Sequence, residues 1–243
     1  MDVTRENLPR LTEFARKGMD GFNVTIPHKV EIMKLLDRYD PVVTATGSCN
    51  TVLNENGLLC GYNTDYSGFV KTIEELRHDI EGKNILIAGT GGIFRSVCMA
   101  LLTEFHPGSI TALSRNPEAA GKKLSDFRGI KRIGIEGYGE LDGKYHVLVN
   151  CSPAGMHPDV HSMPFSEDLI ESSEIIIDTV YNPPETTLVK TGLEKGKKCI
   201  TGLDLYIYQA LESLKIFTGI DSTYREVRDL VEDAWKSGEF GRN

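Results

Sequence analysis

Short apolar segments recur through the middle of the chain, each followed by a stretch with helical spacing, and this alternation constrains the fold most. The segments are near-continuous runs of Ile, Leu and Val, which is typical of strands that are buried on both faces. Strands that alternate with helices form parallel sheets covered by helices on both sides. The sequence therefore predicts a doubly wound α/β sheet with strands over residues 84–88, 110–113, 146–150, 174–178 and 198–201 and helices over 96–105 and 117–127.

The rest of the chain is less regular and predicts a second, smaller and incomplete α/β domain. We expect residues 1–67 to form this domain, with residues 203–243 returning to pack on it and the sheet domain over 68–202 inserted between them. A hairpin is expected around an Asn-Glu-Asn-Gly segment, whose residues favour tight turns. The further expected elements are helices over 6–17 and 28–37, strands over 21–25, 50–53 and 58–62, and a helical tail over 205–235 that is broken near 219–222.

A glycine-rich turn, residues 89–95 with the sequence GTGGIFR, follows the expected strand 84–88 and precedes a helix. Glycines here let the backbone approach a pyrophosphate, whose charge is met by free N–H groups at the helix start. Phe94 stands where the G-x-G-x-x-G pattern has its third glycine, and a plain strand-to-helix connection is the alternative. With the strand before it and the helix after it, Gly89, Gly91 and Gly92 indicate a dinucleotide site.

The end of the next strand carries Ser114 and Arg115. An acidic residue at this place would bind a ribose 2′-hydroxyl and favour NAD. A guanidinium pairs well with phosphate, so Arg115 instead favours the 2′-phosphate of NADP. The alternative is an ordinary solvated surface arginine.

Composition argues against several kinds of partner. The formal charge is −8 and the pI is near 5.3, whereas nucleic-acid binding needs a positive surface. No window of about 20 apolar residues exists, so no membrane span is expected, and the N-terminus does not read as a secretory signal. The 5 cysteines and 6 histidines lack the spacing of a metal or redox motif, so we expect no metal site and a cytoplasmic location.

Several segments, taken in order, resemble shikimate dehydrogenases, which are nicotinamide-dependent oxidoreductases of the shikimate pathway of aromatic amino acid biosynthesis. The resemblance covers essentially the whole chain, and the first and third segments are highly specific in combination. The segments are residues 21–29 (GFNVTIPHK), 47–52 (GSCNTV), 61–65 (GYNTD), 89–95, 150–156, 178–183 and 202–209.

The resemblance implies that Lys29 and Asp65 form the catalytic pair of an NADP-dependent enzyme interconverting 3-dehydroshikimate and shikimate. The chemistry agrees, because hydride reduction of a ketone leaves an alkoxide that needs a proton donor or a nearby positive charge. A carboxylate can also hold ring hydroxyls in place. The other implied roles are substrate binding by Thr25, Asn50, Gln209 and Tyr181, and cofactor binding by Gly89, Gly91, Gly92, Arg95, Ser114, Arg115, Asn150 and Gly202.

Each of these residues also has a structural alternative. Lys29 could be a solvated lysine at a helix start, Asp65 an N-cap, and Asn50 a turn residue. Gln209 could simply be packed or exposed on its helix. We favour a site because several residues match the family in order and spacing.

The chain departs from the family in three places. Family members usually begin with a strand, a helix and a second strand before the point that matches Met1, and that opening carries the serine pair that binds the substrate carboxylate. We therefore expect a gap inside the sheet of the smaller domain, weak or absent shikimate binding, and pairing of the exposed strand edge with another chain, as in a homodimer. In addition, Phe94 replaces a small residue, and Asp204 replaces a glycine beside the expected nicotinamide position.

Three functions remain open at this point. The first is an active enzyme in which another group or another subunit replaces the absent part. The second is a truncated or diverged relative that binds nucleotide or a cyclic polyol without turnover. The third is a regulatory protein that senses NADP(H) or a cyclic polyol.

Overall fold

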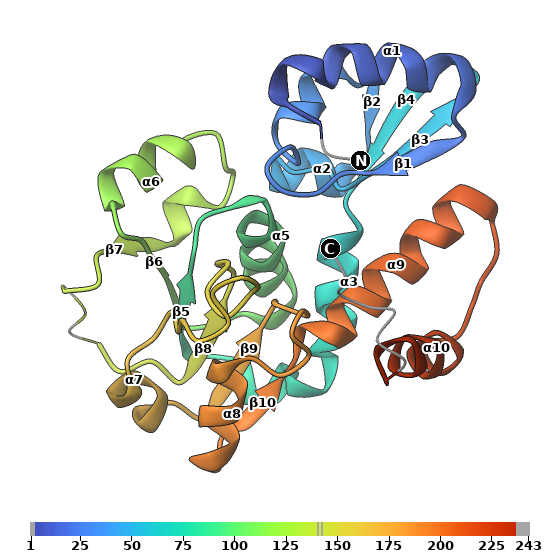
Figure 1. Cartoon of the computed structure of the whole chain (residues 1–243). Helices are drawn as coiled ribbons and strands as arrows, with labels where there is room; N and C mark the ends of the chain where they lie inside the picture. Colours follow the sequence, from blue (N-terminus) through green and yellow to red (C-terminus); the bar gives the residue numbers. More distant parts are fainter. Residues whose placement is uncertain (1–2, 140, 142, 237–243) are drawn as a thin grey trace.

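The computed structural model describes residues 3–139, 141 and 143–236, and within them the chain folds around two separate sheets (Figure 1). A six-stranded sheet has the order β10-β9-β8-β5-β6-β7, and all its pairings are parallel. This confirms the predicted doubly wound α/β class. The strands are β5 (Asn84–Ala88), β6 (Ser109–Leu113), β7 (Gly134–Glu136), β8 (Val147–Asn150), β9 (Ile175–Asp178) and β10 (Lys198–Ile200).

Successive side chains along β5 point to opposite faces of the sheet and enter two different hydrophobic cores. This is why the strand is apolar throughout. Ile85 and Ile87 of β5 lie in the larger core, which α3 (Thr64–Thr72) and α5 (Gly92–Ala100) cover. Leu86 and Ala88 lie in the core on the other face, which α7 (Glu167–Ser172) and α8 (Thr187–Glu194) cover.

The strand order reverses between β5 and β8, because β6 and β7 follow on one side of β5 and the later strands on the other. In sheets of this kind, ligands bind in the crevice at the carboxyl ends of the strands where the order reverses. The glycine turn after β5 and the loop after β8 therefore meet at this point.

The second sheet has four strands in the order β1-β3-β4-β2. It is continuous, so the gap expected inside it is absent from the described part of the chain, and the free strand edges are those of β1 and β2. Helix α1 (Leu8–Gly18) covers one face, where Leu8 and Ala15 pack with Val52 and Leu59. The strands are β1 (Gly21–Asn23), β2 (Arg38–Tyr39), β3 (Thr51–Glu55) and β4 (Leu58–Tyr62).

Two helices connect the sheets. Helices α3 and α9 (Gly202–Thr218) pack together so closely that a Cβ on Gly68 would lie 2.9 Å from the backbone nitrogen of Gln209. Both helices also send apolar side chains, Phe69 and Leu205, into the larger core. Figure 1 shows α3 and α9 running between the two parts, with α10 (Tyr224–Lys236) beside α9. The predicted domain boundaries fall next to these helices and stay a prediction.

Some predicted elements were wrong in extent. Residues 28–37 do not form one helix: after a turn at Lys29 they form the short 3-10 helix η2 (Glu31–Leu35), because the chain must become extended at Leu36 to enter β2. The helix at 96–105 begins at Gly92 and ends in a π-helical turn, η4 (Leu101–Phe105). The remaining helices are η1 (Arg5–Asn7), α2 (Pro41–Thr46), η3 (Glu74–Leu76), α4 (Arg77–Ile80), α6 (Pro117–Lys123) and η5 (Ile130–Arg132).

Among the helices that the structure describes, none is long and apolar enough to cross a membrane.

Candidate active site

An ion pair between Lys29 and Asp65 stands at the centre of the candidate site. The lysine Nζ lies 2.7 Å from the Asp65 Oδ2, and the two side chains are only 12% and 6% exposed. A direct contact at this distance offsets part of the cost of removing the two groups from water. A charged donor and a charged acceptor are thus held side by side.

Local structure places both members of the pair. Asn63 is the N-cap of α3, since its side chain accepts a hydrogen bond from the Tyr66 backbone nitrogen. Asp65 is therefore not the cap, and its carboxylate in the first turn of α3 is available to Lys29. The Lys29 backbone is fixed from the other side, because its carbonyl accepts a 2.8 Å hydrogen bond from the Cys49 nitrogen.

Asn50 holds the second oxygen of the carboxylate. Its Nδ2 donates to Asp65 Oδ1 at 3.0 Å and to Thr64 Oγ1 at 2.9 Å, while its Oδ1 accepts from the Thr64 backbone nitrogen at 2.8 Å. Asn50 is 3% exposed. The amide is therefore a buried part of the ion-pair environment rather than a turn residue at the surface.

The ion pair also touches the glycine turn. A Cβ built on Gly92, at the start of α5, would lie 3.0 Å from Lys29 Cβ and 3.1 Å from Lys29 Cδ. Ser48 adds a second link, since its hydroxyl donates to the Gly92 carbonyl at 3.3 Å. The lysine stem thus lies directly against the turn that the sequence predicts to bind a pyrophosphate.

The conformation of the glycine turn fits an anionic ligand. Gly89 has φ +91°, and a Cβ there would lie 2.8 Å from the Cys151 carbonyl oxygen, so only glycine is accommodated. Gly91 faces open space and is the N-cap of α5, where no side chain caps the free N–H groups. Phe94 does not block the turn: it is fully buried and packs edge-on against the Phe127 ring, with centroids 6.1 Å apart.

Ser114 and Arg115 follow β6, whose end is joined to the glycine turn by a hydrogen bond from the Gly89 nitrogen to the Leu113 carbonyl. Arg115 is exposed, and Ser114 is half-buried with its hydroxyl bonded to the Asn116 carbonyl. A basic group beside the turn is suited to the 2′-phosphate of a dinucleotide.

Asn150 and Asp178 hold the loop at the end of β8. Asn150 is fully buried, donates to Asp178 Oδ1 at 3.0 Å and accepts from the Ser152 backbone nitrogen and hydroxyl. Burial raises the pKa of Asp178 to about 6, although hydrogen bonds from Thr186, Val180 and Asn150 oppose the shift. Asn150 therefore shapes this loop from inside.

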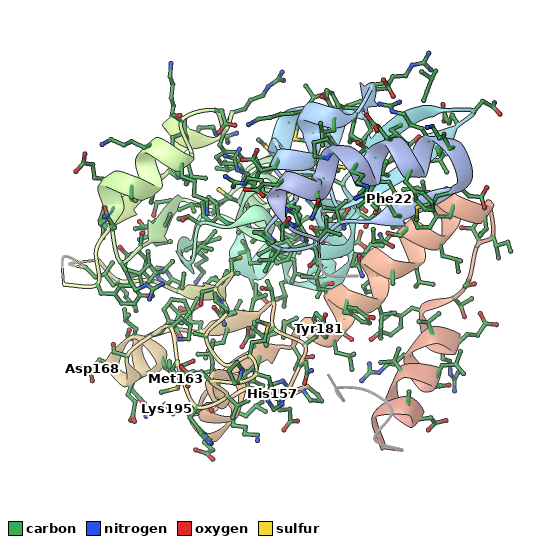
Figure 2. All side chains as sticks on the ribbon, turned by 45° about the horizontal axis from the view of Figure 1, so that its top comes forward. Phe22, His157, Met163, Asp168, Tyr181 and Lys195 are labelled. Carbon is green, nitrogen blue, oxygen red and sulfur yellow. The ribbon has the colours of Figure 1, made fainter. Side chains whose placement is uncertain are left out.

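The start of α9 lies against the segment that follows β9. A Cβ on Gly202 would lie 2.4 Å from the Val180 carbonyl oxygen, so the helix can begin here only with glycine. Tyr181 is 39% exposed and stacks on Tyr206 of α9 at 4.4 Å between centroids, and Figure 2 shows it beside that helix. Its exposed ring is free to contact a ligand.

Asp204 does not stand as an unpaired charge on α9. Its carboxylate accepts a hydrogen bond from the Tyr224 hydroxyl and lies 3.9 Å from Arg228 Nη1, both on α10. Burial and the nearby carboxylate raise the pKa of Tyr224, so the phenol keeps its proton at neutral pH and donates a hydrogen bond to Asp204. Tyr224 also stacks on Tyr208. The contacts of Asp204 therefore fasten α10 to α9.

The remaining predicted residues differ in how they relate to the ion pair. Thr25 is exposed in the turn that carries Lys29, where its carbonyl accepts from the His28 nitrogen. Gln209 donates to the Tyr206 carbonyl one turn back along α9. Arg95 is 2% exposed and donates to the Lys123 carbonyl and to Asp126, so it has a packing role that we did not predict, and its cofactor role stays a prediction.

Ser48 lies inside the matched segment 47–52 but was not predicted as part of the site, and Ser213 lies outside all the matched segments. Ser213 lies on α9, four residues after Gln209, and its hydroxyl is close to those of Thr51 and Thr64. A polar residue within an apolar helical stretch was the available signal, but it does not say which distant groups it meets.

A parallel sheet with a glycine turn at its reversal point, next to a buried lysine–carboxylate pair, defines a Rossmann-type oxidoreductase with a separate substrate part. A sequence profile described as the shikimate dehydrogenase substrate binding domain matches residues 1–52. The chain is 38% identical to the NADP(+) shikimate dehydrogenase of Methanococcus maripaludis, covering 90% of this chain and 79% of the relative. It therefore belongs to the shikimate dehydrogenase family.

A further relative and a solved structure belong to the same family. The NADP(+) shikimate dehydrogenase of Methanococcus vannielii is 38% identical, over 97% of this chain and 86% of its own length. The crystal structure of the Thermus thermophilus shikimate 5-dehydrogenase, in complex with NADP(H) and shikimate, superposes with a TM-score of 0.81 at 27% identity. The match covers 96% of this chain and 86% of that one.

Proposed function

We propose that this chain is an NADP-dependent shikimate dehydrogenase that interconverts 3-dehydroshikimate and shikimate. The observation that carries the proposal is the contact of Lys29 with Gly92. It joins a buried charged pair, suited to proton transfer at a substrate oxygen, to a helix start suited to a dinucleotide. A site for one ligand alone would not need the two groups in contact.

Reduction of the substrate ketone needs a hydride on carbon and a proton on oxygen, and bound NADPH supplies the hydride. Lys29 donates the proton to the developing alkoxide, and in the reverse direction it takes the proton back. Asp65 stabilises the ammonium by the direct ion pair and accepts a hydrogen bond from a ring hydroxyl. Asn50 holds the Asp65 carboxylate in the orientation that faces the Lys29 ammonium and the ring hydroxyl.

The other predicted residues take the roles that their positions suit. Gly89, Gly91 and Gly92 receive the pyrophosphate, while Ser114 and Arg115 receive the 2′-phosphate. On the opposite side of the reversal point, Tyr181 would lie between the nicotinamide and the substrate. Asn150, which is fully buried, and Gly202 would hold the backbone that lines the cofactor, and Thr25 and Gln209 would bind the polyol. We also propose that residues 1–67 and 203–243 form the substrate domain and residues 68–202 the cofactor domain.

An absorbance assay tests the proposal. Shikimate and NADP+ with the purified protein should produce the NADPH band, and quinate or NAD+ should give a slower rise. A protein that binds NADP+ by calorimetry but gives no band with either acid would instead support a relative without turnover, which the comparisons do not favour.

We further propose a homodimer in which the four-stranded sheet takes part. Among the residues that the structure describes, β1 pairs with β3 only, so its outer edge is open to a strand from a second copy. Light scattering should give twice the chain mass of 26.9 kDa, and hydrogen exchange should slow in residues 21–23 as the protein is concentrated. A constant monomer mass would refute the dimer. For location we propose the cytoplasm, because all five cysteines are free.

A further inference from the structure

Ser213 is a buried hydroxyl at the meeting point of several elements. It is 3% exposed on α9, and its Oγ lies 2.9 Å from Thr51 Oγ1 on β3 and 3.1 Å from Thr64 Oγ1 on α3. Asn23, at the end of β1, donates to it at 3.0 Å. Its proton has a partner within the helix, the Gln209 carbonyl at 2.9 Å.

More groups surround this hydroxyl than it can bond at one time. A serine hydroxyl carries one proton and two acceptor sites. When the proton goes to the Gln209 carbonyl, Ser213 Oγ accepts from Asn23 and from the Thr64 hydroxyl. In the arrangement proposed here, Thr64 accepts from Asn50 Nδ2 and gives its own proton to Ser213 Oγ. Thr51 Oγ1, 2.9 Å from Ser213 Oγ, is the competing donor for that site. The Thr51 hydroxyl then donates to Asn50 Oδ1.

This arrangement acts together with the Thr64 backbone nitrogen, which donates to Asn50 Oδ1, to orient the Asn50 amide. Asn50 Oδ1 faces the Thr51 hydroxyl and the Thr64 nitrogen, which leaves Nδ2 facing Thr64 Oγ1 and Asp65 Oδ1. Without Ser213, the Thr64 proton has Asn50 Oδ1 as its nearest alternative acceptor, at 3.3 Å. The hydroxyl would then rotate, and the support for Asn50 Nδ2 would weaken.

We propose that Ser213 is a positioning residue for the substrate site: it orients Thr64 and Asn50, which in turn hold the Asp65 carboxylate against Lys29. The role rests on the proposed function of Asp65 and Asn50 in holding the substrate. It also sets the place of α9, and with it Gln209, relative to α3. Ser213 itself touches no substrate.

The test compares four variants by shikimate KM, NADP+ KM and kcat. Ser213→Ala removes the hydroxyl, Ser213→Cys keeps the shape but leaves a weak hydrogen-bonding group, and Ser213→Thr restores a hydroxyl. Thr218→Val is the matched control, because Thr218 makes the same bond to the carbonyl four residues back on α9, at 2.7 Å, but is exposed.

We expect Ser213→Ala to raise the shikimate KM about tenfold, which corresponds to ~1.4 kcal/mol, with the NADP+ KM unchanged. Ser213→Cys should change in the same direction, Ser213→Thr should return toward the parent value, and Thr218→Val should equal the parent. Loss of thermal stability with an unchanged shikimate KM would overturn the proposal, as would equal effects of Ser213→Ala and Thr218→Val.

A second measurement separates this proposal from the proposed function. Hydrogen exchange of the Thr64 amide, which donates to Asn50 Oδ1, needs no turnover. It should speed up in Ser213→Ala and not in Thr218→Val. If the parent protein does not oxidise shikimate, the proposed function fails, but faster Thr64 exchange would still support the positioning of Asn50. Unchanged exchange would overturn it.

Discussion

Replacing Gly92 by alanine adds one methyl group between the glycine turn and Lys29, the proposed proton donor. The new carbon would lie 3.0 Å from Lys29 Cβ, 3.1 Å from Cδ and 3.5 Å from Cγ. Carbon atoms prefer separations of about 3.5–4.0 Å, so the two segments must move apart by roughly half an ångström. Lys29 cannot yield alone, because its carbonyl is bonded to the Cys49 nitrogen.

The displacement should reach the reacting groups. A misplacement of about 1 Å can cost about a hundredfold in rate, so half of it should lower kcat about tenfold, or ~1.4 kcal/mol in activation free energy. The added methyl points toward Lys29 and does not enter the open side of the turn that Gly91 faces. The affinity for NADP+ should therefore change by no more than about twofold, an amount below 0.5 kcal/mol.

Steady-state kinetics and calorimetry check this prediction together. Gly18→Ala is the control, because its Cβ would meet nothing within 4 Å at the end of α1, and it should leave both quantities unchanged. Gly91→Ala should show the opposite pattern, with NADP+ affinity reduced, since its Cβ enters the open side of the turn. A Gly92→Ala enzyme with parental kcat would refute the reasoning that the turn positions Lys29.

Three further predictions concern single residues. Lys29→Ala should lower kcat by roughly a hundredfold or more, as for loss of a positioned acid; an unchanged rate would remove the mechanism. Arg115→Asp should weaken NADP+ binding by roughly tenfold to a hundredfold, the range of one charged hydrogen bond, and calorimetry showing better NAD+ than NADP+ binding by the parent would contradict the cofactor assignment. Folding raises the pKa of Asp178 from 3.8 to about 6, so the folded state holds the proton more tightly and stability should fall as pH rises from 4 to 6. Asp178→Asn should reduce that fall by about 2 kcal/mol in urea unfolding at the two pH values; an equal fall in both proteins would show that Asp178 does not cause it.

The sequence by itself determined five of the six strands described in the large sheet and the place of the glycine turn. The strand β5 matches its predicted bounds, residues 84–88, because continuous apolar runs are a local signal that burial on both faces imposes. Short elements were less well predicted. The strand β7 was missed, and the helix expected over 28–37 is a turn followed by a 3-10 helix, since three to five residues carry too little periodicity.

Only the tertiary structure decided which of the candidate residues meet. The motifs named Lys29, Asp65 and Asn50, but their hydrogen bonds depend on how the turn after β1, the start of β3 and the start of α3 pack together. The contact of Lys29 with Gly92, and the burial of Ser213 behind Asn50, join segments that have no sequence pattern in common. Periodicity and turn chemistry act over a few residues, whereas contacts between distant segments follow from the packing of whole helices and sheets.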